Sequence, residues 1–175
     1  MNLVELANSI VNVEVMYSTY VGDPRKVVPL EAMNQAVELV RSNKSSEQSE
    51  EKIRKDLTSL AAIAVAVNKE SKKTSAIVTL KKPTPERKQE LFSKAGAEEL
   101  ADEFIFELGN VEVAEKERGK GLANHLLNRL LGLRNSRAHT IYCSTNSDEV
   151  ANMLRAYRFS SIGDGQEKPY LLGLM

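Results

Sequence analysis

The chain has 175 residues, 42% hydrophobic and 27% charged, a composition typical of a globular protein with enough apolar side chains for a core. Its 24 Lys and Arg residues balance its 24 Asp and Glu residues, so overall charge favours neither nucleic acid nor a membrane as partner. A single cysteine excludes an internal disulfide framework, and the sequence shows neither a basic leader before an apolar block nor a segment of membrane-spanning length. We therefore expect a soluble, cytoplasmic protein.

The patterns in the first sixty residues indicate several kinds of secondary structure. Between Leu3 and Val15 the apolar residues first follow helical spacing and then alternate as in a strand. Residues 21–29 form a turn-rich break, and residues 29–42 place apolar side chains on one face of an amphipathic helix with Pro29 in its first turn. The polar stretch 42–52 is expected to be a solvated loop or the exposed start of a helix.

From residue 60 onward the elements are clearer. Residues 60–70 and 74–82 are apolar runs joined by a polar turn, which predicts a β-hairpin. Thr84 and Pro85 predict the cap and first turn of a helix that Gly96 closes. The remaining predicted elements are a strand over 102–116, a helix over 119–133, a strand over 139–146, a helix over 147–159 capped by Ser147 or Asn146, and a closing hairpin over 159–175.

This order of elements predicts the fold class. A strand–helix–strand–helix sequence after hairpin strands indicates an α/β protein with a mixed, mostly antiparallel sheet flanked by helices. We expect a single domain over residues 1–175, with a variable helical part over about 1–57.

The stretch from Arg118 to Gly121, Arg-Gly-Lys-Gly, stands directly before a leucine-rich helix. A helix N-terminus offers unpaired N–H groups and partial positive charge, and glycines let an anion approach the backbone closely. The stretch is not a Walker loop, because no Ser or Thr follows Lys120, nor a dinucleotide fingerprint, because Asn124 replaces the third glycine. An anion site is the favoured interpretation, and an ordinary loop with surface charges is the alternative.

In the form R-x-x-G-x-A, preceded by ELGNVEV and followed by NHLLNRLL, this segment resembles motif A of the GNAT acetyltransferase superfamily. The resemblance extends over about residues 58–175 and implies a GNAT-like acyl-CoA N-acyltransferase fold. It implies that the motif holds the pyrophosphate of acetyl-CoA through the residues Arg118, Gly119, Lys120, Gly121, Leu122 and Ala123.

The same resemblance implies further site residues. Main-chain groups of Val111 and Val113 would pair with the pantetheine arm, while their side chains are expected to face the core. Asn146 would touch the cofactor, although a residue between strand and helix is more often a cap. Glu107 matches the position of a catalytic glutamate, six residues before Val113; an outward strand residue or the partner of a lysine is an equally weighted alternative.

Two positions depart from the family pattern. Arg158 replaces the glycine that usually precedes Phe159, so the turn must avoid positive φ or tolerate strain. The position of the usual proton-donating tyrosine is Leu154, and Tyr157 lies nearly a turn further on. We assign no general acid.

Other reactive residue types are given ordinary roles. Cys143 alternates with Ile141 in a predicted strand, so we expect a buried, inert thiol rather than a nucleophile. His125 and His139 lack companions at ligand spacing, which predicts surface histidines and no metal. Nucleic-acid binding through the cations between Lys81 and Lys88 is disfavoured, because acidic residues are interleaved.

Together these observations predict an N-acetyltransferase. An acetyl group would pass from acetyl-CoA to a primary amine of an unidentified small molecule or protein, by direct attack in a ternary complex. The alternative is a catalytically inactive CoA-binding or interaction module. A homodimer remains open.

Overall fold

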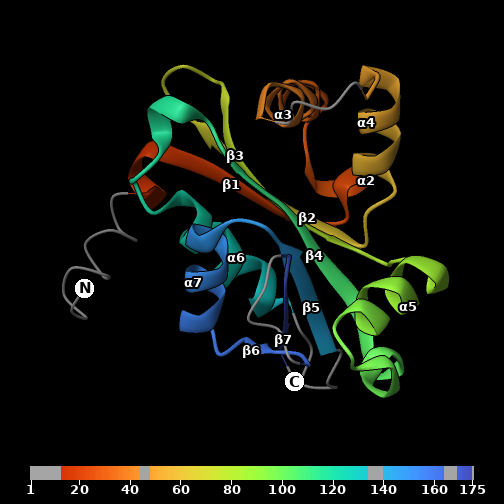
Figure 1. Cartoon of the computed structure of the whole chain (residues 1–175). Coiled ribbons are helices and arrows are strands. Elements are labelled where there is room, and N and C mark those ends of the chain that lie inside the picture. The colour runs from red at the N-terminus through yellow and green to blue at the C-terminus, as the bar shows by residue number, and fades with distance from the viewer. Residues whose placement is uncertain (1–12, 44–47, 134–139, 164–168, 175) are drawn as a thin grey trace. The chain divides into compact units, whose positions relative to one another are not determined.

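The computed structural model describes residues 13–43, 48–133, 140–163 and 169–174 (Figure 1). The predictions for residues 1–12, for His139 and for part of the polar stretch 42–52 lie outside these residues. The contacts divide the chain into unit 1, residues 1–79 and 110–133, and unit 2, residues 80–109 and 134–175. That the chain folds as a single domain stays a prediction.

Unit 1 contains most of the N-terminal half of the chain. Its elements are β1 (Tyr17–Gly22), α2 (Pro24–Val27), α3 (Leu30–Asn43), α4 (Glu50–Thr58), β2 (Ala62–Asn68), most of β3 (Thr74–Lys81), the end of β4 (Phe104–Val113), the 3-10 helix η2 (Glu115–Glu117) and α6 (Leu122–Gly132). Strands β1 and β2 are antiparallel, with pairs running from Tyr17 opposite Asn68 to Gly22 opposite Ile63. Ala114 N–H donates to the Ser75 carbonyl at 2.8 Å, so the chain leaving β4 lies beside β3.

Helices α3 and α4 cover one face of these strands. Their apolar side chains form a core cluster with Ile63, Val65 and Ile77 of β2 and β3. Since side chains alternate along a strand, Ala62, Ala64 and Ala66 point to the opposite face, which α6 contacts (Figure 1). Three small side chains allow a helix to approach the sheet closely.

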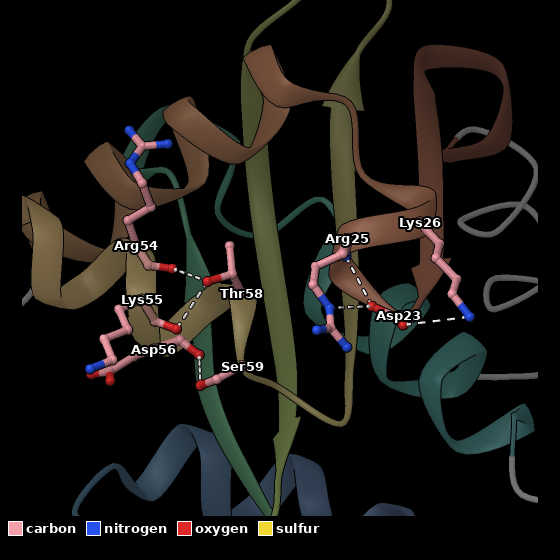
Figure 2. Close-up of polar contacts among 8 residues, drawn as sticks. All are labelled: Asp23, Arg25, Lys26, Arg54, Lys55, Asp56, Thr58 and Ser59. Carbon is pink, nitrogen blue, oxygen red and sulfur yellow. Dashed lines mark hydrogen bonds and ion pairs between the residues drawn. The ribbon is translucent and has the colours of Figure 1, made fainter.

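Short polar contacts hold the helix ends of unit 1 (Figure 2). Asp23 caps α2, because its Oδ1 accepts a hydrogen bond from the Arg25 N–H at 3.0 Å. At the C-terminal end of α4, the hydroxyls of Thr58 and Ser59 donate to carbonyls of the last turn at 2.9–3.1 Å. These bonds satisfy terminal backbone groups of the two helices.

Unit 2 contains the end of β3, α5 (Pro85–Lys94), the 3-10 helix η1 (Glu98–Glu103), most of β4, β5 (Thr140–Thr145), α7 (Asp148–Ala156), β6 (Ser160–Ser161) and β7 (Tyr170–Leu174). The rings of Phe92, Phe104 and Tyr142 meet at centroid distances of 5.2–6.1 Å and anchor α5 on β4 and β5. Tilted and edge-on aromatic pairs of this kind are favourable contacts in a core.

The strand order is β1-β2-β3-β4-β5-β7-β6. Strand β4 runs parallel to β5, with pairs from Phe104 opposite Thr140 to Leu108 opposite Cys143. Strand β7 is antiparallel to both β5 and β6. The predicted mixed, mostly antiparallel sheet flanked by helices is confirmed.

Most predicted elements are confirmed, including both hairpins, the helix capped by Thr84, and Ser147 as the cap of α7. The strand alternation expected near Val13 and Val15 is wrong, because residues 13–16 are helical. Strand β1 was not predicted, since its residues YSTYVG do not alternate between apolar and polar. The helix predicted from Gly119 begins at Leu122.

No helix among the described residues is long and apolar enough to span a membrane.

Candidate functional site

In unit 1, the backbone between β4 and α6 follows an unusual path. After η2 and an extended Arg118, both Gly119 (φ 76°) and Gly121 (φ 77°) adopt the left-handed conformation. A side chain strains this conformation, so the two glycines allow a turn that other residues would resist. A Cβ on Gly119 would meet no atom within 4 Å, so the backbone there borders open space.

The start of α6 has no capping side chain at its N-cap position. Gly121 is its N-cap and supplies no side-chain hydrogen bond, and the first turn contains no acidic residue. Leu122 is buried and anchors the turn, while Ala123 is half-buried. The N–H groups of this turn and the positive end of the helix are therefore available to an anion.

Arg118 and Lys120 flank this helix start and differ in their contacts. Arg118 is exposed, and its side chain forms no ion pair within the described part of the chain. Lys120 donates to Glu117 at 2.7 Å, and the Tyr17 hydroxyl donates to the same Oε2 at 2.5 Å. The hydrogen bonds from Lys120 and Tyr17 lower the pKa of Glu117, whereas burial and Glu117 raise the pKa of Tyr17. Glu117 and Tyr17 were missed by sequence reasoning, because a partner so distant in sequence leaves no local pattern.

The end of β4 is irregular. Asn110 has φ 39°, which is rare for a non-glycine residue and turns the backbone of the strand at this point. Val111 and Val113, expected to face the core, are both half-buried. Asn43 of α3 donates to Glu112 at 3.0 Å and so holds this segment.

His125 corrects another prediction. It was expected on the surface, but it is buried on the same face of α6 as Leu122 and Leu126, and its ring Nε2 lies 3.2 Å from Thr19 Oγ1 of β1. Burial lowers the pKa of His125, with Arg129 nearby adding to the effect. The helix period would have placed it on the leucine face.

In unit 2, Glu107 is the centre of a polar cluster. Its side chain is 4% exposed, and its carboxylate accepts bonds from Arg87 Nε at 3.2 Å and Nη2 at 3.0 Å. Lys81 Nζ lies 3.2 Å from Oε2, and the Tyr142 hydroxyl donates to Oε2 at 3.3 Å. The expectation of an outward strand residue is therefore wrong, while the lysine partner is found.

The contacts with Glu107 shift the pKa of two of its partners. The hydrogen bond to Glu107 raises the pKa of Arg87, and burial together with the Glu107 charge raises the pKa of Tyr142. The raised pKa keeps the Tyr142 phenol protonated at neutral pH, where it donates a hydrogen bond to Glu107. Arg87, Lys81 and Tyr142 come from α5, β3 and β5. The sequence analysis weighed Lys81 and Arg87 only as cations for nucleic-acid binding.

Cys143, next to Tyr142 in β5, is buried as predicted. Burial, with the Glu107 charge adding to it, raises the pKa of its thiol to about 12. The thiol is therefore protonated at neutral pH and unsuited to nucleophilic attack.

At the end of β5, Asn146 is exposed in the bend before α7, and the cap of α7 is the Ser147 hydroxyl, which accepts from the Val150 N–H at 3.2 Å. Leu154 is fully buried, and burial raises the pKa of the half-buried Tyr157. Arg158 adopts φ 67°, so the turn tolerates strain rather than avoiding it. No group of three or more His, Cys, Asp or Glu among the described residues could hold a metal ion.

Comparison with solved structures identifies the fold. An acyl-CoA N-acyltransferase from Pseudomonas aeruginosa is 15% identical, with a TM-score of 0.60 over 90% of this chain and 97% of that one. NAA60 from Arabidopsis thaliana, in complex with acetyl-CoA, is 13% identical, with a TM-score of 0.61 over 90% and 97%. YhbS from Escherichia coli, a GNAT family N-acetyltransferase in complex with CoA, is 15% identical, with a TM-score of 0.59 over 90% and 80%.

Models of protein families and the sequences of curated proteins give no match to this chain. At identities of 13–15% the structural likeness establishes the fold and leaves the activity open. The chain therefore has the GNAT acyltransferase fold that motif A implied.

Proposed function

We propose that this protein is an N-acetyltransferase that moves an acetyl group from acetyl-CoA to a primary amine. The observation that carries the proposal is the start of α6, where two left-handed glycines and two cations surround the helix N–H groups and the N-cap residue is a glycine without a capping side chain. The same fold occurs in proteins solved with CoA or acetyl-CoA.

The pyrophosphate of the cofactor would bind at residues 118–123. Backbone N–H groups of Gly119 to Ala123 would donate to phosphate oxygens, and Arg118 would neutralise charge from outside. Lys120 would either keep its bond to Glu117 or turn to the phosphates. The pantetheine arm would pair with main-chain groups of Val111 and Val113, beyond the irregularity at Asn110, and Asn146 would contact the cofactor from the end of β5.

Glu107 is proposed as the base. The ammonium form of the acceptor loses one proton to its carboxylate, the amine nitrogen bonds to the acetyl carbon, and the carbon–sulfur bond breaks. The departing thiolate takes the second amine proton, so that free CoA, the amide and one released proton are the products. A buried carboxylate on β4 with polar partners supports this role.

Two observations favour a second candidate function, an inactive CoA-binding module. Leu154 is buried where a phenol would serve as acid, and Glu107 is engaged by two cations. A module of this kind would bind the cofactor and release no thiol with any amine.

One experiment separates these outcomes. CoA or acetyl-CoA at one hundred times its dissociation constant should raise the free energy of unfolding by about 2.7 kcal/mol. Gly121→Asp should abolish the shift, because a carboxylate would lie in the phosphate site, whereas Gly132→Asp at the far end of α6 is the matched control. Absence of a melting shift at millimolar cofactor contradicts the proposal. A shift without thiol release from acetyl-CoA, over an amine panel, favours the inactive module.

A further inference from the structure

The polar cluster of unit 2, formed by Lys81, Arg87, Glu107 and Tyr142, carries more positive than negative charge. Two cations contact one carboxylate, and Tyr142 is neutral. Lys88, the next cation on α5, is engaged elsewhere, with the Phe104 carbonyl at 3.1 Å and Asp102 at 3.7 Å.

Nearby acidic residues do not cancel this excess. Glu90 pairs with Lys94 and interacts with Arg87 only at longer range. Glu86 precedes Arg87 in the first turn of α5, where adjacent positions point in different directions. Among the described residues, Lys81 and Arg87 therefore share a single carboxylate.

The cluster is also asymmetric in its exposure. The Glu107 side chain is 4% exposed, whereas Arg87 is 51% exposed and Lys81 is 38% exposed. Arg87 uses Nε and Nη2 on Glu107, which leaves Nη1 free of Glu107. Solvent, or a ligand, therefore meets the two cations before it meets the carboxylate.

These facts restrict which amine can reach Glu107. A plain ammonium group would displace Arg87 or Lys81 from Glu107 and leave two or more cations close together without an anion, which is costly in a half-buried site. A zwitterion avoids this cost. Its ammonium can take the place of the cations on Glu107 while its own carboxylate takes the place of Glu107 on Arg87 and Lys81.

We propose that the acceptor is an amino acid or a closely similar zwitterion, with its amine on Glu107 and its carboxylate on Arg87 and Lys81. The inference rests on the proposed function, because it takes Glu107 as the base. The planar guanidinium group selects a carboxylate by its two parallel hydrogen bonds, and Lys81 adds a point charge. Arg87 and Lys81 are thus specificity-determining residues of the acceptor site.

The test uses matched pairs of acceptors. The α-amino acids, β-alanine and 4-aminobutyrate are each compared with their own carboxamide, by thiol release from acetyl-CoA. For the pairs that react, kcat/KM should be at least about tenfold higher for the acid, which is the effect of one charge-assisted contact. Carboxamides or simple alkylamines that react as well as the acids would overturn the inference.

Variants of Arg87 and Lys81 test whether these two residues cause the preference for the acid. Arg87→Met and Lys81→Met should each reduce the preference for the acid to about threefold or less, mainly through KM. Arg87→Lys should retain part of the preference, since lysine keeps the positive charge but cannot form the two parallel hydrogen bonds of the guanidinium group. Lys82→Met is the matched control, because Lys82 is exposed directly after β3 and should keep the full preference. An unchanged preference in Arg87→Met and Lys81→Met contradicts the assignment.

Binding decides the question if no thiol is released. With CoA present, the acids should raise the melting temperature of the wild type and the carboxamides should not. Equal shifts for both, or a shift from neither, overturn the inference, while stabilisation by CoA still supports the cofactor site. Loss of CoA binding itself would instead contradict the proposed function.

Discussion

Tyr17 and Glu117 are 100 positions apart in the chain and share a hydrogen bond of 2.5 Å. The bond ties the first residue of β1 to η2, the short helix just before the glycine turn. Lys120 bonds the same carboxylate oxygen at 2.7 Å. The glycines permit the turn before α6, and these side chains hold it in one conformation.

Tyr17→Phe should therefore lower the free energy of unfolding at neutral pH by about 1 kcal/mol, the usual net value of one hydrogen bond. Because the folded state lowers the pKa of Glu117, the stability that this carboxylate contributes is present above its unfolded pKa and is lost as pH falls through its folded pKa. The deficit of the variant should shrink in acid. Urea unfolding at neutral pH and in acid measures it, with Tyr20→Phe on the same strand as control; an equal deficit at both pH values contradicts the role of the ionised pair.

Cys143 should be inert. Its burial and its pKa of about 12 leave almost no thiolate at neutral pH. Thiol reagents should modify the folded protein slowly and the urea-unfolded protein quickly, as followed by mass spectrometry, and they should leave acetyl transfer nearly intact. If Cys143→Ala abolished turnover without lowering stability, the thiol would have a catalytic role.

Glu107→Gln tests the proposed base. The amide keeps the shape of the side chain and removes its basicity, so turnover should fall about 10²-fold or more while CoA affinity persists. The deficit should shrink as pH rises, because free amine then forms in solution. Unchanged turnover would make Glu107 a structural ion-pair partner.

The stability of Glu107→Gln is a separate measurement. Removing the charge leaves Arg87 and Lys81 with a neutral partner, so the free energy of unfolding should fall. The double variant with Arg87→Met should lose less than the sum of the two single changes, since both remove the same contact.

Arg158→Gly should stabilise the fold. Arg158 has φ 67°, a conformation that costs a residue with a Cβ about 1–2 kcal/mol and costs glycine little. We expect a gain of about 1 kcal/mol in the free energy of unfolding, measured by urea denaturation. As the contrasting control, Gln89→Gly in the exposed face of α5 should lose about 0.5 kcal/mol, because a helical residue there becomes glycine. A loss in Arg158→Gly would mean that the arginine side chain outweighs the strain.

Structural features that depend on a few neighbouring residues could be predicted from the sequence alone. Thr84 and Ser147 as caps and the hairpin of β2 and β3 depend on local hydrogen bonds and on turn residues. Motif A also sufficed to predict the GNAT acyltransferase fold.

Contacts between distant segments were decided by the tertiary structure. The burial of His125 depends on Thr19 of β1, a strand whose residues show no alternation, and the partners of Glu107 come from three other elements of unit 2. The strain at Arg158 and the half-burial of Val111 and Val113 likewise follow from how the chain is packed. A periodic pattern reports which side of an element is apolar, but the partner that a polar side chain meets is set by packing, which no local pattern encodes.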